Sequence, residues 1–206
     1  MFSLITKNRA CIRALFIRRN ALRLLAPYMG GCLLRLTALR QALYAIRIMQ
    51  RMKYKIIDKS KAEEVAKLAV CLTNEIIERT GIKHFNADLP LAVSLCQDYV
   101  SNGLYSVIAA FDENEIIGFG ALCESHSLYA EGSFGIIQEF YVMPNYRSQD
   151  VGKDLISEIV NYSKSKKWKR LELCTPPLPE FNRTVEFYQA NGFEITGGCK
   201  MKCVIV

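Results

Sequence analysis

Hydrophobic positions recur at helical spacing in two stretches of the first half of this chain. One amphipathic helix is predicted over residues 61–79, and Ser60 and Glu63 have the spacing of a capping box at its start. Its repeating apolar positions are Val65, Leu68, Leu72 and Ile76. A second helix is predicted after Asp88, which would cap it, with 102–103 at its end.

Strand patterns alternate with these helices. Residues 53–57 alternate polar and apolar as an edge strand would, and apolar runs at 104–112 and 115–123 predict two strands joined by a short polar turn. Two glycines inside the second run indicate a bulge or a close approach of another segment. Residues 124–133 are predicted to form a long hairpin tip.

The stretch 134–164 combines a strand, a turn and a helix start. Residues 134–143 are apolar except for Gln138-Glu139, and Pro144 ends the strand pairing, which leaves the next strand free to diverge and open a wedge. Beyond Pro144, a turn containing Arg147 leads to a helix start that contains Lys153. Unpaired N–H groups at a helix start beside positive charge predict an anion site, and a phosphate site in particular.

The charge of the chain is unevenly distributed. The net charge is +7, yet residues 1–51 hold nine Arg and Lys7 with no acidic residue. Residues 52–206 therefore hold 17 basic and all 20 acidic residues, a net charge of −3. The predicted folded part gives no electrostatic reason to expect nucleic acid as a partner.

Residues 1–51 are interpreted as a basic leader outside the domain, which we assign to 52–206. The leader would be disordered, or translated sequence upstream of a true start at Met49 or Met52. A targeting segment and a membrane-surface segment are the alternatives. Residues 1–51 are also the only basis for a third hypothesis, a basic protein that binds nucleic acid or a membrane surface. Its longest uncharged run is too short to span a bilayer, so no transmembrane segment is expected and a cytoplasmic location is the default.

The eight cysteines and two histidines show neither metal-ligand nor disulfide spacing. Buried free thiols in a reducing compartment are the simplest interpretation, and no metal is expected. His84 and His126 are interpreted as surface loop residues, with His126 placed where it could overhang a substrate cleft.

Two motifs after residue 140 resemble a known family, the GNAT superfamily of acetyl-CoA-dependent N-acetyltransferases. Its pyrophosphate loop reads Q/R-x-x-G-x-G/A, and Arg147-x-x-Asp150-x-Gly152 matches at the first and last positions. Asp150 departs from the usual glycine, although aspartate tolerates a left-handed backbone and could cap the helix. The segment from Asn182 to Phe193 resembles the family's N-x-x-A-x-x-Y-x-x-x-G-F helix, with Val185 in place of alanine.

The resemblance implies an α/β fold with a mixed, mostly antiparallel sheet, a central splayed parallel strand pair and flanking helices. Residues 170–175 would be the strand that splays from 134–143, and 200–206 the core of the last strand. Acetyl-CoA would be the co-substrate, with its pantetheine arm along Tyr141-Val142 and Asn182 in contact with that arm or nearby backbone. The residues implied for its pyrophosphate are Arg147, Ser148, Gln149, Asp150, Val151, Gly152 and Lys153.

The implied reaction is acetyl transfer to a primary amine by direct attack in a ternary complex. Tyr188 is at the family's position for the acid that protonates the departing sulfur. Glu139 is the first candidate for the base, acting directly or through water; the alternative is that it is a purely structural carboxylate. Glu124 and Glu75 are weaker candidates for recognising a cationic substrate. The alternative function is an acetyl-CoA-binding module with little or no turnover, because Asp150 places negative charge near the pyrophosphate.

The acceptor is left open at the level of a small-molecule or peptide amine. The net charge of −3 in 52–206 mildly favours a cationic acceptor. The sequence leaves the oligomeric state open, a homodimer included.

Overall fold

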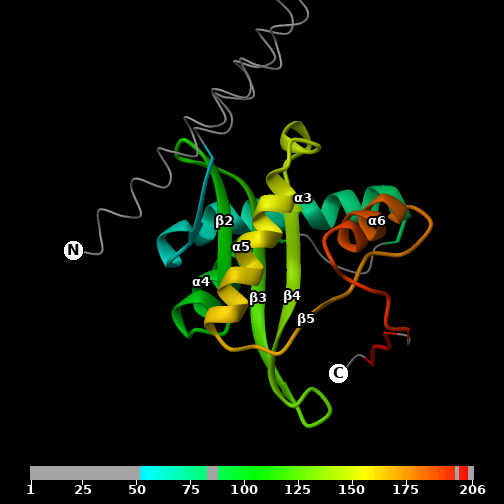
Figure 1. The fold of residues 1–206 in the computed structure, drawn as a ribbon. Coiled ribbons are helices and arrows are strands. Elements are labelled where there is room, and N and C mark those ends of the chain that lie inside the picture. The colour runs from blue at the N-terminus through cyan, green and yellow to red at the C-terminus, as the bar shows by residue number, and fades with distance from the viewer. Residues whose placement is uncertain (1–51, 83–87, 198–199, 204–206) are drawn as a thin grey trace, which may run out of the picture. The chain divides into compact units, whose positions relative to one another are not determined.

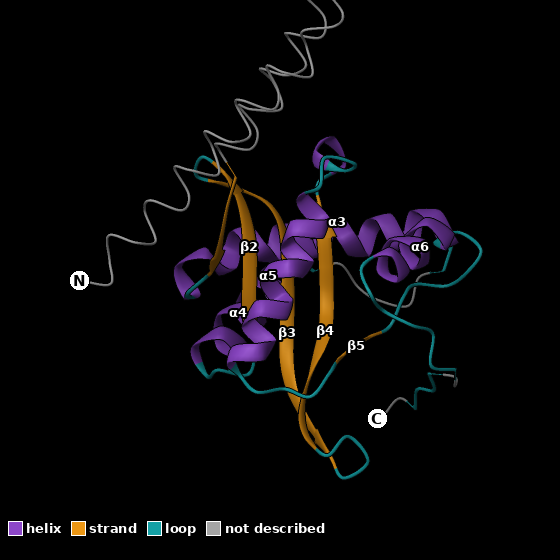
Figure 2. Cartoon of the chain, in the orientation of Figure 1, coloured by secondary structure: helices purple, strands orange, loops and turns teal. Residues whose placement is uncertain are grey.

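The computed structural model describes residues 52–82, 88–197 and 200–203. Within these residues five strands form one sheet in the order β1-β2-β3-β4-β5 (Figures 1 and 2). The strands are β1 (Met52–Ile56), β2 (Ser106–Asp112), β3 (Glu115–Ser127), β4 (Gly132–Val142) and β5 (Leu171–Leu173). The helices are α3 (Ala62–Thr80), α4 (Leu89–Ser101), α5 (Val151–Ser165) and α6 (Asn182–Ala190), with short 3-10 turns η2 (Lys59–Lys61) and η3 (Pro144–Tyr146).

The helices cover both faces of the sheet. The apolar side chains of α3 and α4 pack with those of β2 and β3 around Phe119, whereas α5 and α6 pack on the opposite face around Leu122. In Figure 1 helix α5 crosses in front of the strands and α3 runs behind them. This three-layer α/β arrangement confirms the predicted fold class.

The predicted helices are confirmed, but of the two N-terminal caps predicted for α3 and α4 only the one at Asp88 is. The Asp88 side chain accepts a hydrogen bond from the N–H of Leu91 at 3.0 Å, as a helix cap should. The capping box at Ser60 and Glu63 is wrong. Asp58 instead accepts from the N–H of Ser60 at 2.7 Å, and Glu63 pairs with Lys67.

The β3–β4 hairpin is longer than its sequence suggested. Strand β3 continues to Ser127 and β4 begins at Gly132, so most of the predicted loop 124–133 is paired strand. The polar side chains at 124–127 gave no alternating strand pattern in the sequence, because a hairpin that projects beyond the helices has two solvated faces. Its tip exposes Leu128 fully and Tyr129 largely.

A β-bulge divides β4 into two halves. Ala121 of β3 pairs with Glu139 and Leu122 pairs with Ile137, so Gln138 is an extra residue in β4. The extra residue reverses the alternation of side chains. Ile137 lies in the core under α5, whereas Tyr141 lies in the core under α3, although the two are four positions apart.

The parallel pair is short and lies at the edge of the described sheet. Gly135–Ile137 of β4 pair with Leu171–Leu173 of β5, and the two strands are not paired beyond that point. The pair was expected at the centre because a last strand was predicted over 200–206. Residues 200–203 form no strand, and the others of that stretch lie outside the described residues.

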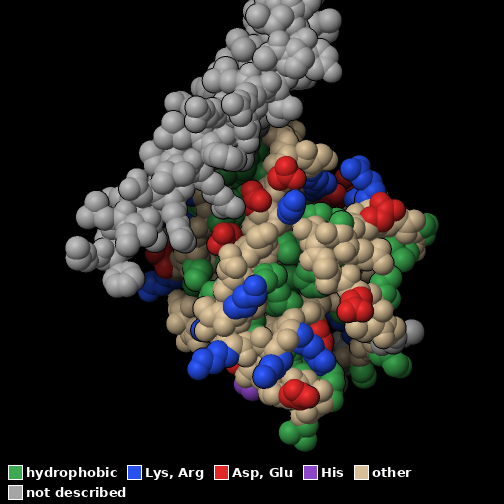
Figure 3. Space-filling view, viewed as in Figure 1, with side chains coloured by type: hydrophobic (Ala, Val, Ile, Leu, Met, Phe, Trp, Pro, Cys, Tyr) green, Lys and Arg blue, Asp and Glu red, His purple; other side chains and the backbone are tan. Residues whose placement is uncertain are grey.

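No helix among the described ranges is long and apolar enough to cross a membrane. Basic and acidic side chains of the described residues are interspersed on the face shown in Figure 3. The predictions made for residues 1–51 and for His84 concern positions outside the described residues.

Close packing at Gly135 leads to a stability prediction. A Cβ there would lie 2.3 Å from two atoms of the Trp168 ring and 2.8 Å from Leu171 Cδ2. Gly135→Ala should therefore lower the free energy of unfolding by about 2 kcal/mol, as overpacking does, measured by urea unfolding of the full chain. The matched control is Gly120→Ala, whose Cβ would meet mainly the flexible end of Ile159, at 2.6 Å. An equal loss in both variants would contradict a specific clash at Gly135.

Candidate functional site

The second half of β4 has an edge that β5 does not cover. The strand continues to Val142, whereas its pairing with β5 ends at Ile137. An unpaired strand edge offers backbone donors and acceptors to an extended ligand. We call this gap between the second half of β4 and the chain after β5 the wedge.

One peptide group fixes which backbone atoms face the wedge. The N–H of Met143 donates to the carbonyl of Ile117 in β3 at 2.9 Å, so the carbonyl of Val142 in the same peptide points the other way. The N–H and carbonyl of one strand residue point to the same edge, so the Val142 N–H also faces the wedge. The predicted backbone donor near Val142 is therefore correctly oriented.

The turn after β4 presents the start of α5. Ser148 and Asp150 have positive φ angles of 58° and 62°, and the first helical bond joins the Asp154 N–H to the Asp150 carbonyl at 2.9 Å. Helix geometry therefore leaves the N–H groups of 151–153 without partners inside α5, where an anion is stabilised. The left-handed backbone at Asp150 agrees with the expectation, but its side chain forms no cap.

Gly152 allows close packing within the protein. A Cβ at this position would lie 3.2 Å from Phe187 Cζ and 3.8 Å from Val142 Cγ2. The glycine thus lets the start of α5 approach both α6 and the end of β4. Val151 is buried beside it, whereas Gln149 is part-buried and turned back by a 2.7 Å hydrogen bond to the Asn145 carbonyl.

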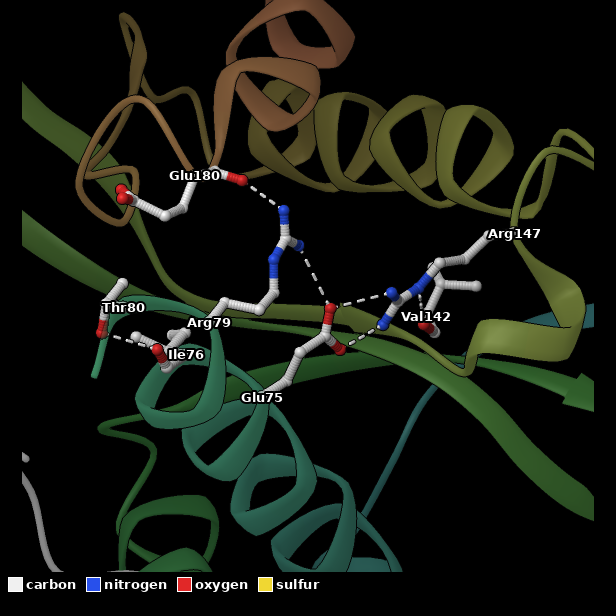
Figure 4. Close-up of polar contacts among 7 residues, drawn as sticks. All are labelled: Glu75, Ile76, Arg79, Thr80, Val142, Arg147 and Glu180. Carbon is white, nitrogen blue, oxygen red and sulfur yellow. Dashed lines mark hydrogen bonds and ion pairs between the residues drawn. The ribbon is translucent and has the colours of Figure 1, made fainter. Parts of the chain in front are cut away.

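The guanidinium group of Arg147 is engaged in a network of protein contacts (Figure 4), although its side chain is still 39% exposed. Its Nε donates to the Val142 carbonyl at 2.8 Å, and its two terminal nitrogens donate to the two oxygens of Glu75 at 2.9 and 2.6 Å. Arg147 holds the pKa of Glu75 below its usual range, whereas partial burial acts in the opposite direction and raises that pKa. Lys153, the other cation of the turn, is exposed. Because Glu75 is paired with arginine, it is not offered to a cationic substrate.

Glu139 is a part-buried carboxylate of the site. The bulge turns it towards α4 and Tyr105, whose hydroxyl donates to Oε1 at 3.4 Å, while Oε2 is buried with no hydrogen-bond partner. Burial raises the pKa of Glu139 to about 7, and the Tyr105 hydrogen bond opposes this rise. A carboxyl group with this pKa can accept and release a proton near neutral pH.

Tyr188 lies in the aromatic core on the other face of the sheet. Its ring centroid is 5.3 Å from that of Phe187, 5.4 Å from that of Phe193 and 6.0 Å from that of Phe140. Burial raises the pKa of its phenol, which keeps the group protonated and able to donate. Glu139 and Tyr188 thus face opposite sides of β4.

The other predicted residues are placed as follows. Asn182 is exposed at the start of α6, where its N–H donates to the Pro179 carbonyl at 3.2 Å. His126 lies in β3 and 3.5 Å from Glu124, an exposed pair on the hairpin rather than in the wedge. Sequence reasoning missed Tyr105 and Arg79, because nothing in their local patterns distinguishes them from packing and surface residues.

The fit of acetyl-CoA can be tested on these observations. An uncovered strand edge fits an extended chain of amides, and the free N–H groups at the start of α5 fit a phosphate. Asp150 is acidic and Arg147 is paired with Glu75, so the backbone N–H groups are the main donors at the start of α5. The residues present therefore fit this group.

Comparisons with known proteins agree with this geometry. Residues 103–195 match the family model described as Acetyltransferase (GNAT) domain. The fold resembles an aminoglycoside acetyltransferase, meta-AAC0020, from an uncultured soil metagenomic sample, solved with sisomicin, at 15% identity and a TM-score of 0.60, covering 77% of this chain and 99% of that one. No curated protein sequence matches the chain.

Two further structures share the fold. The aminoglycoside N-acetyltransferase AAC(6')-Iy, solved with CoA, is 18% identical with a TM-score of 0.61, covering 74% of this chain and 94% of that one. The ribosomal-protein-alanine N-acetyltransferase from Brucella melitensis biovar Abortus 2308 is 15% identical with a TM-score of 0.58, covering 74% and 99%.

The matched domain and the wedge define an acetyl-CoA-dependent acyltransferase. Residues 103–195 form a GNAT acetyltransferase domain, a type of domain that uses acetyl-CoA as its co-substrate.

The pKa of Glu139 predicts a pH-dependent stability. The fold favours the protonated acid, so this contribution is present below the ordinary value of 4.5 and is lost as the pH rises through about 7. Glu139→Gln removes the loss, so its stability relative to wild type should be greater at pH 8 than at pH 4 by on the order of 3 kcal/mol. Urea unfolding at both pH values measures this, with Glu115→Gln, an exposed position of β3, as control. A difference that does not change with pH would contradict the burial of an ionisable Glu139.

Proposed function

We propose that this protein transfers the acetyl group of acetyl-CoA to a primary amine by direct attack in a ternary complex. The observation that carries the proposal is Glu139. It is a part-buried carboxyl group with a pKa of about 7, whose buried Oε2 has no hydrogen-bond partner among the described residues, in the strand whose edge is open at the wedge. A group of this kind suits the removal of a proton from an incoming amine.

The proposed binding places the phosphates at the start of α5 and the pantetheine arm along β4. The N–H groups of 148–153 would hold the pyrophosphate, and Asn182 the arm or nearby backbone. The wedge-facing N–H of Val142 would donate to the thioester oxygen, where negative charge develops. Acetyl-CoA, when bound, supplies an activated acyl group.

The proposed proton transfers use the two faces of the sheet. Glu139 would take a proton from the amine nitrogen, directly or through water, as the nitrogen forms its bond to the acyl carbon. Tyr188 would give its hydroxyl proton to the sulfur as the carbon–sulfur bond breaks. An alkyl ammonium has a pKa of about 10.4 and arrives mostly protonated, so the Glu139 carboxylate would first attract the cation and then accept its proton.

The acceptor is proposed to be a small-molecule or peptide amine. Two structures with this fold are aminoglycoside acetyltransferases and a third is a ribosomal-protein-alanine acetyltransferase, which supports amines of both kinds. The net charge of −3 over 52–206 favours a cationic acceptor.

The role of Tyr188 is tested by removing only its hydroxyl. Tyr188→Phe should reduce kcat by about 10²-fold or more, because general acid catalysis contributes that much, with CoA affinity nearly unchanged. CoA release against a panel of amines measures kcat, and calorimetry with CoA measures affinity. The control is Tyr129→Phe, the same change at the exposed hairpin tip. Equal rates in Tyr188→Phe and wild type would exclude the phenol as the acid, and CoA binding without release for any amine would favour a non-catalytic binding module.

The role of Glu139 is tested by the pH dependence of kcat/KM. The rate should rise with pH through about 7 as Glu139 loses its proton. Glu139→Gln should lose this limb and about 10²-fold in rate. Tyr105→Phe removes a hydrogen bond that lowers the pKa of Glu139, so its limb should move to higher pH. Cys96 of α4 is another titratable group that interacts with Glu139, so Cys96→Ala is the control. If the rise of kcat/KM occurs at the same pH in Tyr105→Phe as in wild type, another group than Glu139 causes it.

A further inference from the structure

A continuous series of polar contacts runs through Glu75 of α3 (Figure 4). On one side, Arg147 joins the Glu75 carboxylate to the Val142 carbonyl. On the other side, Arg79 donates from Nη1 to the same carboxylate at 3.4 Å and from Nη2 to the carbonyl of Glu180. Two guanidinium groups thus share one carboxylate, and each also holds a backbone carbonyl.

The two carbonyls lie at opposite borders of the wedge. Val142 is the last residue of β4, and Glu180 lies just before α6 in the connection that follows β5. The strands are paired only at 135–137 and 171–173, so the backbone ladder does not hold these borders together. The contacts through Glu75 do connect them.

Both arginines are held by aromatic rings as well as by hydrogen bonds. The Arg79 guanidinium lies 4.0 Å from the centroid of Phe181, which is 4% exposed, and that of Arg147 lies 5.3 Å from the centroid of Tyr141. Ring contacts of this kind restrict a guanidinium group that would otherwise sample many rotamers. The series of contacts is therefore anchored at the border residues by packing on both sides.

Stabilisation of α3 alone does not account for this arrangement. The helix is already packed on the sheet by Val65 and Leu68. A single half-exposed ion pair contributes little to stability, whereas a bidentate arginine in a shared network fixes geometry. What the network adds is a defined distance between two backbone segments.

We propose that Glu75 and Arg79 are positioning residues that, with Arg147, form a strap across the wedge and hold the end of β4 and the start of α6 at the separation that acetyl-CoA requires. The proposal rests on the proposed function only in taking the wedge as the acetyl-CoA site. The strap acts through Arg147 on the turn before α5 and through Glu180 on the chain before α6.

The test removes the shared charge and keeps the shape. In the full chain, Glu75→Gln should raise the Kd for CoA about tenfold, since charge-assisted hydrogen bonds are lost at the borders of the site. The KM for acetyl-CoA should rise in parallel, with kcat at saturation within about twofold of wild type, because the substitution affects binding geometry. Hydrogen exchange of the free protein should become faster both at 142–150 and at 178–184.

The matched control is Glu63→Gln, the same substitution in the same helix. Glu63 pairs with Lys67 at 2.6 Å on the exposed face of α3 and connects no other element. This variant should leave the Kd for CoA and the exchange of both segments unchanged. Arg79→Gln should weaken CoA binding as well, but accelerate exchange mainly at 178–184, because Arg147 keeps Glu75. If circular dichroism shows that Glu75→Gln does not fold, Arg79→Gln decides the matter.

Three results would overturn the proposal. Tighter CoA binding by Glu75→Gln would mean that Glu75 competes with the cofactor for Arg147. Unchanged Kd and exchange would reduce the network to a surface ion pair. Faster exchange at one border only in Glu75→Gln would show that the borders are not connected. Failure of the wild type to bind CoA would refute the proposed function, while the exchange data would still decide whether the strap connects the borders.

Discussion

The divergence of β4 from β5 is the constraint on which the site depends. If the parallel pairing of β4 with β5 continued beyond Ile137, it would bury the Val142 N–H in a ladder and leave no place for a ligand. Pro144 ends the run of β4, the turn with two positive φ angles redirects the chain, and α5 begins where β4 stops. The donors at Val142 and at the start of α5 become neighbours because of this single change of direction.

The sequence predicted most elements of this fold and the position of the turn between β4 and α5, because both depend on local chemistry. Periodic apolar positions located α3 and α5, and Pro144 located the end of β4. Two features were out of reach. The extended hairpin carries polar residues on both faces, and the engagement of Arg147 by Glu75 joins positions that are 72 residues apart. Contacts of that kind depend on how the elements pack and leave no local signal.

Asp150 is less disruptive than its charge suggested. Its backbone adopts the left-handed conformation that the family's glycine would adopt, so the turn is retained. Its side chain caps nothing, and Arg147 is committed to Glu75. The turn therefore presents its backbone N–H groups beside one carboxylate, and in the proposed function the affinity for a pyrophosphate would depend on those N–H groups more than on side-chain charge.

The extra residue Gln138 has a consequence for comparing chains of this fold. It reverses the alternation of β4, so that Glu139 faces Tyr105 and α4 instead of the core under α5. A one-residue insertion or deletion at this point moves an acid from one side of the sheet to the other without altering its chemistry. Sequence alignments drawn through β4 without a gap would then equate carboxylates that lie on opposite faces of the sheet.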